Sequence, residues 1–160
     1  MQNHNLSSRS KANLVGVHPD LVRVVELALK KSEVDFMVVE GVRSRETMLA
    51  YYGKGRTAQE CLAKGVPARY AQPTAKKVTW LNNPLMSNHR IMADGYGHAV
   101  DLLPAPYDWK NPKDFDKMAK AMFEAAEELG VSIRWGADWD ADGKPRERGE
   151  TDSPHFELAA

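Results

Sequence analysis

The stretch from Pro112 to Leu129 constrains the fold more than any other part of the chain. Its apolar residues recur at the spacing of one helical face. Asn111 can cap the first turn, Pro112 suits the first helical position, and Gly130 suits the end. A helix with one apolar face buries that face against other elements, so the chain requires a packed core. The face consists of Phe115, Met118, Ala119, Met122, Ala126 and Leu129.

Shorter elements are predicted on both sides of this helix. Helical spacing after His18-Pro19 predicts a helix over 20–31, and further helices are predicted over 45–52 and 58–63. Short β-branched or aromatic runs predict strands over 34–39, 99–103, 133–135 and 156–158. Because the helices are separated by strands that need not be parallel, we expect an α+β fold with a small antiparallel sheet flanked by helices.

Residues 1–160 contain no repeat or low-complexity linker, which favours a single domain with residues 1–16 as a flexible or loosely packed arm. The segment 53–84 has no clear period and is expected to be a long excursion, a kind of segment that often binds ligands. The polar N-terminus lacks the apolar run of a secretory signal, and no stretch is long enough to span a membrane. We therefore expect synthesis in the cytoplasm and no stable membrane association.

Charge and cysteine content exclude several classes of protein. The 22 basic and 22 acidic residues balance, so no overall basic field attracts nucleic acid. Cys61 is the single cysteine, which excludes an internal disulfide and a cysteine-based zinc cluster. Any metal site must use histidine and carboxylate ligands.

Three stretches concentrate residues of that kind. They are Ser87-Asn88-His89, Gly97-His98-Ala99-Val100-Asp101, and Asp152-Ser153-Pro154-His155-Phe156-Glu157. A catalytic zinc site needs three nitrogen or oxygen ligands and an open position for water, so two histidines and one carboxylate suffice.

The order of these stretches resembles a known family. Ser-x-His, then Gly-x-Ala-x-Asp on a strand, then Asp-x-x-His near the C-terminus is similar to the pattern of the D-alanyl-D-alanine carboxypeptidase and L-alanyl-D-glutamate endopeptidase family of zinc peptidases. The resemblance is closest to the single-domain endolysins of bacteriophages. It extends from about Val17 to Leu158 and includes four further stretches outside the long helix: 18–21, 40–44, 134–136 and 154–158.

This resemblance implies a Hedgehog/D-Ala-D-Ala peptidase-like fold with a zinc site at the sheet. His89, Asp101 and His155 would ligate zinc, and Asp152 would be the catalytic carboxylate that moves the proton of the attacking water. Arg43 would stabilise the oxyanion or hold a substrate carboxylate.

One ligand has a rival, because His89 and Asp101 are twelve positions apart and the family usually has a shorter connection. His98 lies three positions before Asp101, and residues three apart on a strand point to opposite faces. An insertion over 90–96 can leave the flanking segments in register, so we prefer His89 to His98.

The base has rivals as well. Glu150 and Glu157 are close to His155 in sequence, and Glu157 could instead orient a ligand from the same face of a strand. Asp152 could also simply cap a turn before Ser153-Pro154.

A second cation is suggested by Asp138, Asp140 and Asp142 before Gly143, which read like the first half of a calcium loop. Position 149 is glycine where a full EF-hand has glutamate, and no helix pair surrounds the turn. The alternatives are a calcium or other hard-cation site and a solvated acidic turn.

The resemblance implies a zinc peptidase that cuts peptidoglycan stem peptides, most simply between L-alanine and D-glutamate. A monomeric phage lysis enzyme, released by a holin-type membrane-permeabilising protein, fits the missing signal peptide. The alternatives are a D-alanyl-D-alanine carboxypeptidase or dipeptidase, a non-catalytic zinc-containing wall-binding module, and a serine hydrolase using Ser87 or Ser153.

Overall fold

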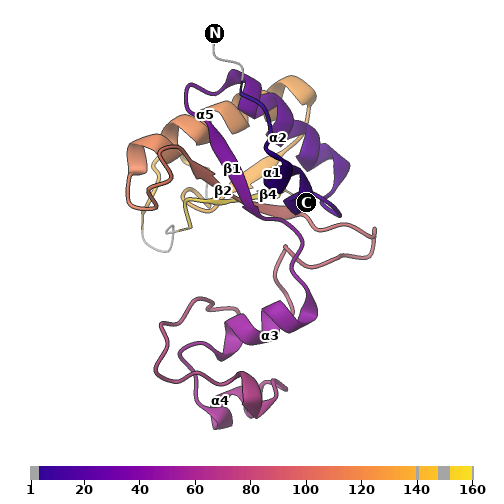
Figure 1. The fold of residues 1–160 in the computed structure, drawn as a ribbon, viewed down its shortest axis with the longest axis vertical. Helices are drawn as coiled ribbons and strands as arrows, with labels where there is room; N and C mark the ends of the chain where they lie inside the picture. The colour runs from indigo at the N-terminus through magenta and orange to yellow at the C-terminus, as the bar shows by residue number, and fades with distance from the viewer. Residues whose placement is uncertain (1–3, 140, 148–151, 160) are drawn as a thin grey trace.

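The computed structural model describes residues 4–139, 141–147 and 152–159 of the chain (Figure 1). Its elements are α1 (Ser8–Asn13), α2 (Pro19–Lys31), β1 (Phe36–Glu40), α3 (Arg45–Gly53), α4 (Ala58–Ala63), the 3-10 helix η1 (Ala68–Tyr70), β2 (Ala99–Pro104), α5 (Pro112–Leu129), β3 (Ile133–Trp135) and β4 (His155–Leu158). The four strands form one antiparallel sheet in the order β1-β2-β4-β3. The predicted α+β fold with a small antiparallel sheet is confirmed.

The long helix α5 begins and ends where its sequence predicts. The Asn111 side chain accepts a hydrogen bond from the Lys113 backbone N–H, and Gly130 takes the left-handed conformation at φ 70° that ends the helix. The apolar face of α5 packs against α2 and β2. The central side chains Phe115, Met118 and Met122 are fully buried, so this contact forms the main core.

Part of the N-terminal segment contacts the sheet through helix α1. Val38 of β1 donates a backbone hydrogen bond to Ser10 Oγ (3.0 Å), and Asn13 Nδ2 donates to the Val38 carbonyl (2.8 Å). Helix α1 thereby satisfies backbone groups on the outer edge of the sheet. The apolar spacing of this segment is weak, so its helix depends on these tertiary contacts.

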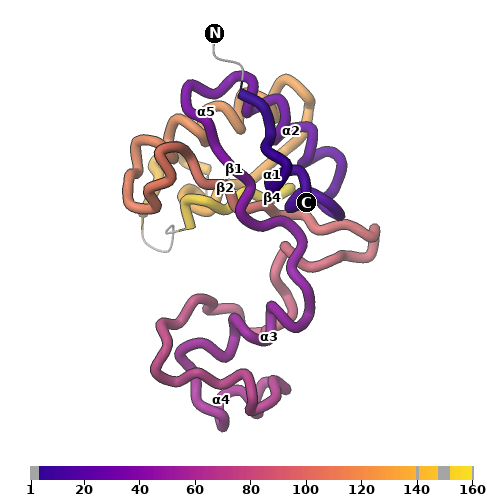
Figure 2. Tube along the Cα trace, in the orientation of Figure 1, coloured from indigo at the N-terminus to yellow at the C-terminus, as the bar shows by residue number. Residues whose placement is uncertain are grey.

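Residues 44–86, here called the α3–α4 lobe, form a second compact part (Figure 2). The trace leaves the sheet after β1, passes through α3 and α4, and returns toward β2. The lobe has a small core of its own, which consists of Leu49, Tyr52, Cys61 and Val66. The expected irregular excursion is therefore an ordered unit beside the sheet. Within the described residues, none of the helices combines the length and apolar character that crossing a membrane needs.

Candidate metal centre

Strands β2 and β4 bring Asp101 and His155 together. The two residues are direct partners in the antiparallel register, so their side chains lie on the same face of the sheet. Val100, Leu102 and Phe156 point to the other face and are buried in the main core. The alternation that fills the core thus leaves a carboxylate and an imidazole side by side on the opposite face.

His89 reaches this face from the loop before β2. Its backbone N–H donates to Ser87 Oγ (3.1 Å), and its carbonyl accepts from the Arg43 backbone N–H (2.8 Å). The imidazole Nδ1 lies 2.7 Å from the Gly41 carbonyl oxygen, which can only accept, so Nδ1 carries the proton. Nε2 is then the ring nitrogen that faces Asp101 and can bind a metal.

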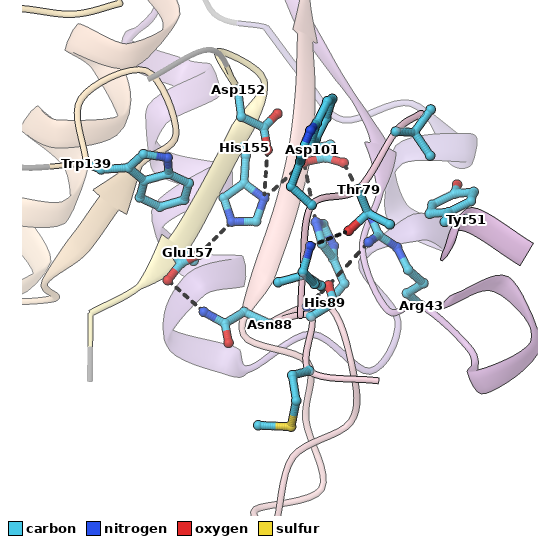
Figure 3. A pocket seen from close by; sticks show the side chains of 15 residues that line it. Arg43, Tyr51, Thr79, Asn88, His89, Asp101, Trp139, Asp152, His155 and Glu157 are labelled. Carbon is cyan, nitrogen blue, oxygen red and sulfur yellow. Dashed lines mark hydrogen bonds and ion pairs between the residues drawn. The ribbon is translucent and has the colours of Figure 1, made fainter. Parts of the chain in front are cut away.

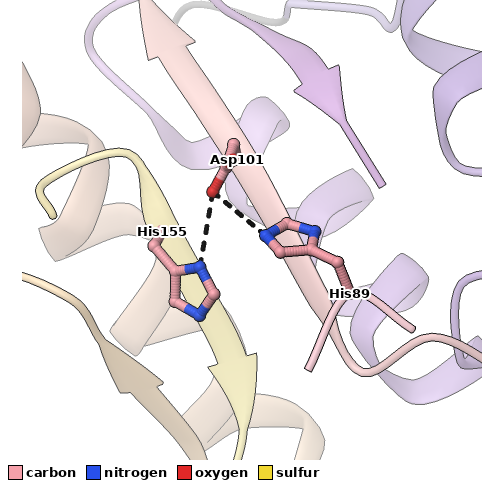
Figure 4. A group of neighbouring side chains, drawn as sticks. All are labelled: His89, Asp101 and His155. Carbon is pink, nitrogen blue, oxygen red and sulfur yellow. Dashed lines mark ion pairs between the residues drawn. The ribbon is translucent and has the colours of Figure 1, made fainter. Parts of the chain in front are cut away.

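Three ligand atoms converge at this point (Figure 4). His89 Nε2 and His155 Nδ1 each lie 3.4 Å from Asp101 Oδ1, and all three atoms lie within 4.8 Å of one another. A tetrahedral ion with bonds of about 2.1 Å separates its ligands by about 3.4 Å. His89 Nε2 and Asp101 Oδ1 are also buried without a hydrogen-bond partner. This donor set fits a metal ion.

The electrostatics of the centre pair an ionised carboxylate with a protonated imidazole. Burial acts to raise the pKa of Asp101, but the neighbouring His155 and His89 imidazoles outweigh it and hold that pKa well below its ordinary value. Burial acts to lower the pKa of His155, but the Asp101 and Glu157 carboxylates on either side of the ring outweigh it and raise that pKa to about 9. In the metal-free protein, positive charge therefore resides on His155 beside an ionised Asp101.

Glu157 fixes the orientation of His155. Its Oε1 lies 2.7 Å from His155 Nε2, which turns Nδ1 toward Asp101. Its Oε2 accepts hydrogen bonds from Asn88 Nδ2 and Arg134 Nη2, both at 2.7 Å (Figure 3 shows the Asn88 contact). Burial acts to raise the pKa of Glu157, but these partners, His155 above all, outweigh it and hold that pKa below its ordinary value. Both carboxylate oxygens of Glu157 are thus paired, which suits a role in orienting His155.

Arg43 lies on the other side of Asp101. Its Nε donates to Glu40, its Nη1 donates to Ser87 Oγ (3.2 Å), and its Nη2 lies 3.9 Å from Asp101 Oδ2. The guanidinium also covers the Tyr51 ring at 4.7 Å. These contacts hold a cationic fork at the metal centre.

Asp152 lies at the open side of the centre. Its Oδ2 is 3.8 Å from His155 Nδ1, and half of its side chain is exposed. Burial raises its pKa, with a smaller opposing effect of His155. Gly136 permits this position, because a Cβ atom there would lie only 2.2 Å from the Asp152 carbonyl oxygen. A carboxylate of raised pKa beside a metal site can accept and return a proton.

A cleft of about 650 Å³ opens over these groups. One part of its lining comes from the metal centre and the other from the α3–α4 lobe (Figure 3). The lining residues are Arg43, Tyr51, Val78, Thr79, Trp80, Leu81, Met86, Ser87, Asn88, His89, Asp101, Trp139, Asp152, His155 and Glu157.

His98 lies away from the centre. Its Nε2 is 2.6 Å from Asp94 Oδ2, and its ring packs edge-on against His18. The longer connection before β2 folds back on itself through a hydrogen bond from the Met92 N–H to the Tyr96 carbonyl (2.9 Å). The extra residues are thereby absorbed in a turn, and His89 instead of His98 reaches Asp101.

The acidic turn is described only in part, because Asp140 lies outside the described residues, as does Glu150. Asp138 accepts hydrogen bonds from the backbone N–H groups of Asp142 (3.3 Å) and Gly143 (3.1 Å). Trp139 projects from this turn, and its ring centroid is 5.4 Å from that of His155.

Sequence reasoning missed Asn88, Arg134 and Trp139 as members of the site. Asn88 is adjacent to a ligand, and Arg134 lies in a stretch that the resemblance already covered. The missing information was the pairing of Arg134 with Glu157 across β3 and β4.

This fold and site define an α+β protein with a cluster of two histidines and one carboxylate that could hold a metal ion under an open cleft. The model of the phage L-alanyl-D-glutamate peptidase family matches residues 2–66 and 64–159, and the chain belongs to this family. It is 31% identical over 155 residues to the L-alanyl-D-glutamate peptidase of Escherichia phage T5, with 93% of each chain covered. It is also similar to the crystal structure of Serratia marcescens L-Ala D-Glu endopeptidase ChiX, at a TM-score of 0.60 and 32% identity, over 99% of this chain and 92% of that one.

Proposed function

We propose that this chain is a zinc-dependent endolysin that hydrolyses the L-alanyl-D-glutamate bond of peptidoglycan stem peptides. The observation that carries the proposal is the convergence of His89, Asp101 and His155 beside Asp152, in a chain of this family. Both named relatives are described as L-Ala-D-Glu peptidases. A centre of two histidines and one carboxylate with an open side is typical of catalytic zinc.

His89 Nε2, Asp101 Oδ1 and His155 Nδ1 would hold the zinc ion. Zinc at such a site lowers the pKa of water toward about 7 and polarises a carbonyl group. Asp152 takes the proton of the attacking water and passes it to the leaving amine, a role that suits its raised pKa and its place at the cleft. Arg43 stabilises the carbonyl oxygen or holds a carboxylate of the substrate.

The decisive experiment digests purified cell wall and identifies the new amino termini by mass spectrometry. We expect new D-glutamate amines. Release of terminal D-alanine without them would support a D-alanyl-D-alanine carboxypeptidase or dipeptidase instead. A protein that binds wall and zinc without releasing any product would be the non-catalytic module.

Two variants test the assigned roles. Asp152→Asn should keep zinc and lose most hydrolysis, whereas His155→Ala should lose both. Unchanged hydrolysis in Asp152→Asn would move the base to Glu150 or Glu157. A chelator should abolish activity and zinc should restore it, whereas a serine hydrolase using Ser87 or Ser153 would survive the chelator.

We also propose that Asp138, Asp140 and Asp142 hold a calcium ion. The support is the Asp-x-Asp-x-Asp-Gly order and the tight turn around Asp138. Calcium titration into metal-stripped protein, followed by tryptophan fluorescence, tests it, since Trp139 lies on this turn. No spectral response would contradict the site.

As an endolysin, the chain would accumulate in the host cytoplasm as a monomer and reach the wall after a holin-type protein permeabilises the membrane. Expression in a bacterial host tests this route. Lysis should require co-expression of a membrane-permeabilising protein, and lysis by the chain alone would contradict it. Light scattering of the purified protein measures its mass against the monomer.

A further inference from the structure

Four large apolar side chains project from one short segment of the α3–α4 lobe. They all line the cleft that contains the metal centre, and here they are called the apolar wall: Val78, Trp80, Leu81 and Met86. The Trp80 side chain is 75% exposed and that of Met86 is 50% exposed. Apolar groups gathered in this way on a surface mark a binding site.

The apolar wall is held in place from behind. Arg56 is only 7% exposed, and its guanidinium lies 3.9 Å from the centre of the Tyr52 ring. It donates to the Tyr52 carbonyl (2.8 Å) and to the Thr79 carbonyl (2.9 Å), next to Trp80. Leu85 packs against the small core of the lobe. The segment between these anchors presents Trp80 and Met86 to the cleft on a supported backbone.

The metal centre lies between this segment and a second aromatic residue. Figure 3 shows Thr79 and Tyr51 on one side of His155 and Trp139 on the other. Trp139 is 38% exposed and lines the same cleft. A substrate bound at the metal therefore extends toward exposed aromatic surface as well as toward the polar groups of the site.

The two residues that flank the scissile bond do not account for this surface. L-alanine offers one methyl group, and D-glutamate offers a carboxylate and a short polar chain. In peptidoglycan the amino group of that alanine is joined to the lactyl group of a muramic acid, so an N-acetylated sugar lies one residue from the scissile bond. Pyranose rings have C–H faces that pack on indole rings while their hydroxyl groups stay in water.

We propose that the apolar wall is a subsite for the glycan strand, with Trp80 stacked on the sugar nearest the scissile bond. This inference rests on the proposed function, because it places the acyl side of the substrate along the α3–α4 lobe. A membrane surface is the other partner that exposed tryptophan and leucine suit. The position of Trp80 within the cleft favours the sugar, because a flat bilayer meets a protruding surface more readily than the lining of a cleft.

The test compares two soluble substrates with the same peptide, one acylated by N-acetylmuramic acid and one by lactic acid. We expect Trp80→Ala to lower kcat/KM about tenfold on the muramoyl peptide, mainly through KM, and less than twofold on the lactoyl peptide. Trp80→Phe should recover most of the loss. Leu62→Ala is the matched control, since Leu62 is 61% exposed on α4 of the same lobe and does not line the cleft.

Three outcomes overturn the glycan subsite. An equal loss on both substrates would make the wall a peptide subsite, and no loss on either would leave it without a role in binding. Sedimentation with phosphatidylethanolamine and phosphatidylglycerol vesicles that disappears in Trp80→Ala would assign the wall to a membrane. If the unmodified protein releases D-glutamate amines neither from the two substrates nor from intact wall, the proposed function itself fails. Failure of the glycan subsite alone leaves this release intact, so the two failures can be told apart.

Discussion

Replacing Glu157 by glutamine removes one charge from the metal centre while it keeps the size and shape of the side chain. Glu157 is buried, and its two oxygens contact His155 Nε2, Asn88 Nδ2 and Arg134 Nη2, each at 2.7 Å. All three partners can donate, but a glutamine side chain has only one oxygen to accept. At least one partner of Glu157→Gln must therefore face an amide group that cannot accept its hydrogen bond.

The magnitude follows from the bond that is lost at His155. A hydrogen bond to a charged group contributes about 1.5–3 kcal/mol. Removing the partner that orients a metal-binding histidine weakens metal affinity by about 10–100-fold. Tenfold corresponds to about 1.4 kcal/mol, so the two ranges agree. We expect Glu157→Gln to bind zinc about 10–100-fold more weakly than the unmodified protein.

Competition with a chromophoric chelator measures this affinity directly, and circular dichroism shows whether the variant folds. Glu127→Gln is a suitable control, because Glu127 lies on the exposed face of α5 and the same charge is removed far from the sheet face that carries the site. If Glu157→Gln bound zinc within twofold of the unmodified protein, Glu157 would have no part in orienting His155.

Three further predictions concern protons, the core and the base. Since the pKa of His155 is raised to about 9 in the metal-free protein, zinc must displace a proton from Nδ1. Zinc affinity should therefore rise with pH until about 9 and then level off, and calorimetry in buffers of different ionisation enthalpy should count one proton released at pH 7; a count of zero would contradict the raised pKa. Met118→Ala empties a fully buried site in α5 and should lower the free energy of unfolding by about 2–5 kcal/mol in urea denaturation, with a change below 1 kcal/mol arguing against close packing there. Gly136→Ala forces a Cβ atom into the Asp152 carbonyl, so hydrolysis should fall by on the order of tenfold or more while zinc stays bound. Full activity of this variant would show that catalysis does not require Asp152 in the position that the structure gives it.

The regular elements were predictable where local signals agree. Helix α5 has a periodic apolar face, a capping asparagine and a terminal glycine, and it spans the predicted residues. Helix α4 likewise has a capping box formed by Thr57 and Glu60. Helix α1 was missed because Ser10 and Asn13 stabilise it through bonds to Val38, and no local pattern records such a contact.

The candidate ligands could be named from their types and order, but their proximity could not. Asp101 and His155 meet through the register of β2 and β4, a pairing between segments more than fifty residues apart. His89 reaches them because the longer loop closes on itself and because Gly41 holds its ring. Both are long-range contacts, so sequence spacing alone left His98 as a rival.

The small core of the α3–α4 lobe has a consequence for how such enzymes can diversify. Leu49, Tyr52, Cys61 and Val66 pack among themselves, whereas the metal centre is built on the sheet. Substitutions in residues 44–86 can therefore change the part of the cleft lining that this lobe forms without repacking the strands that carry Asp101 and His155. Exchanging this lobe between relatives should change which cell walls are attacked and leave the hydrolytic chemistry intact, which makes the lobe a natural unit for engineering host range.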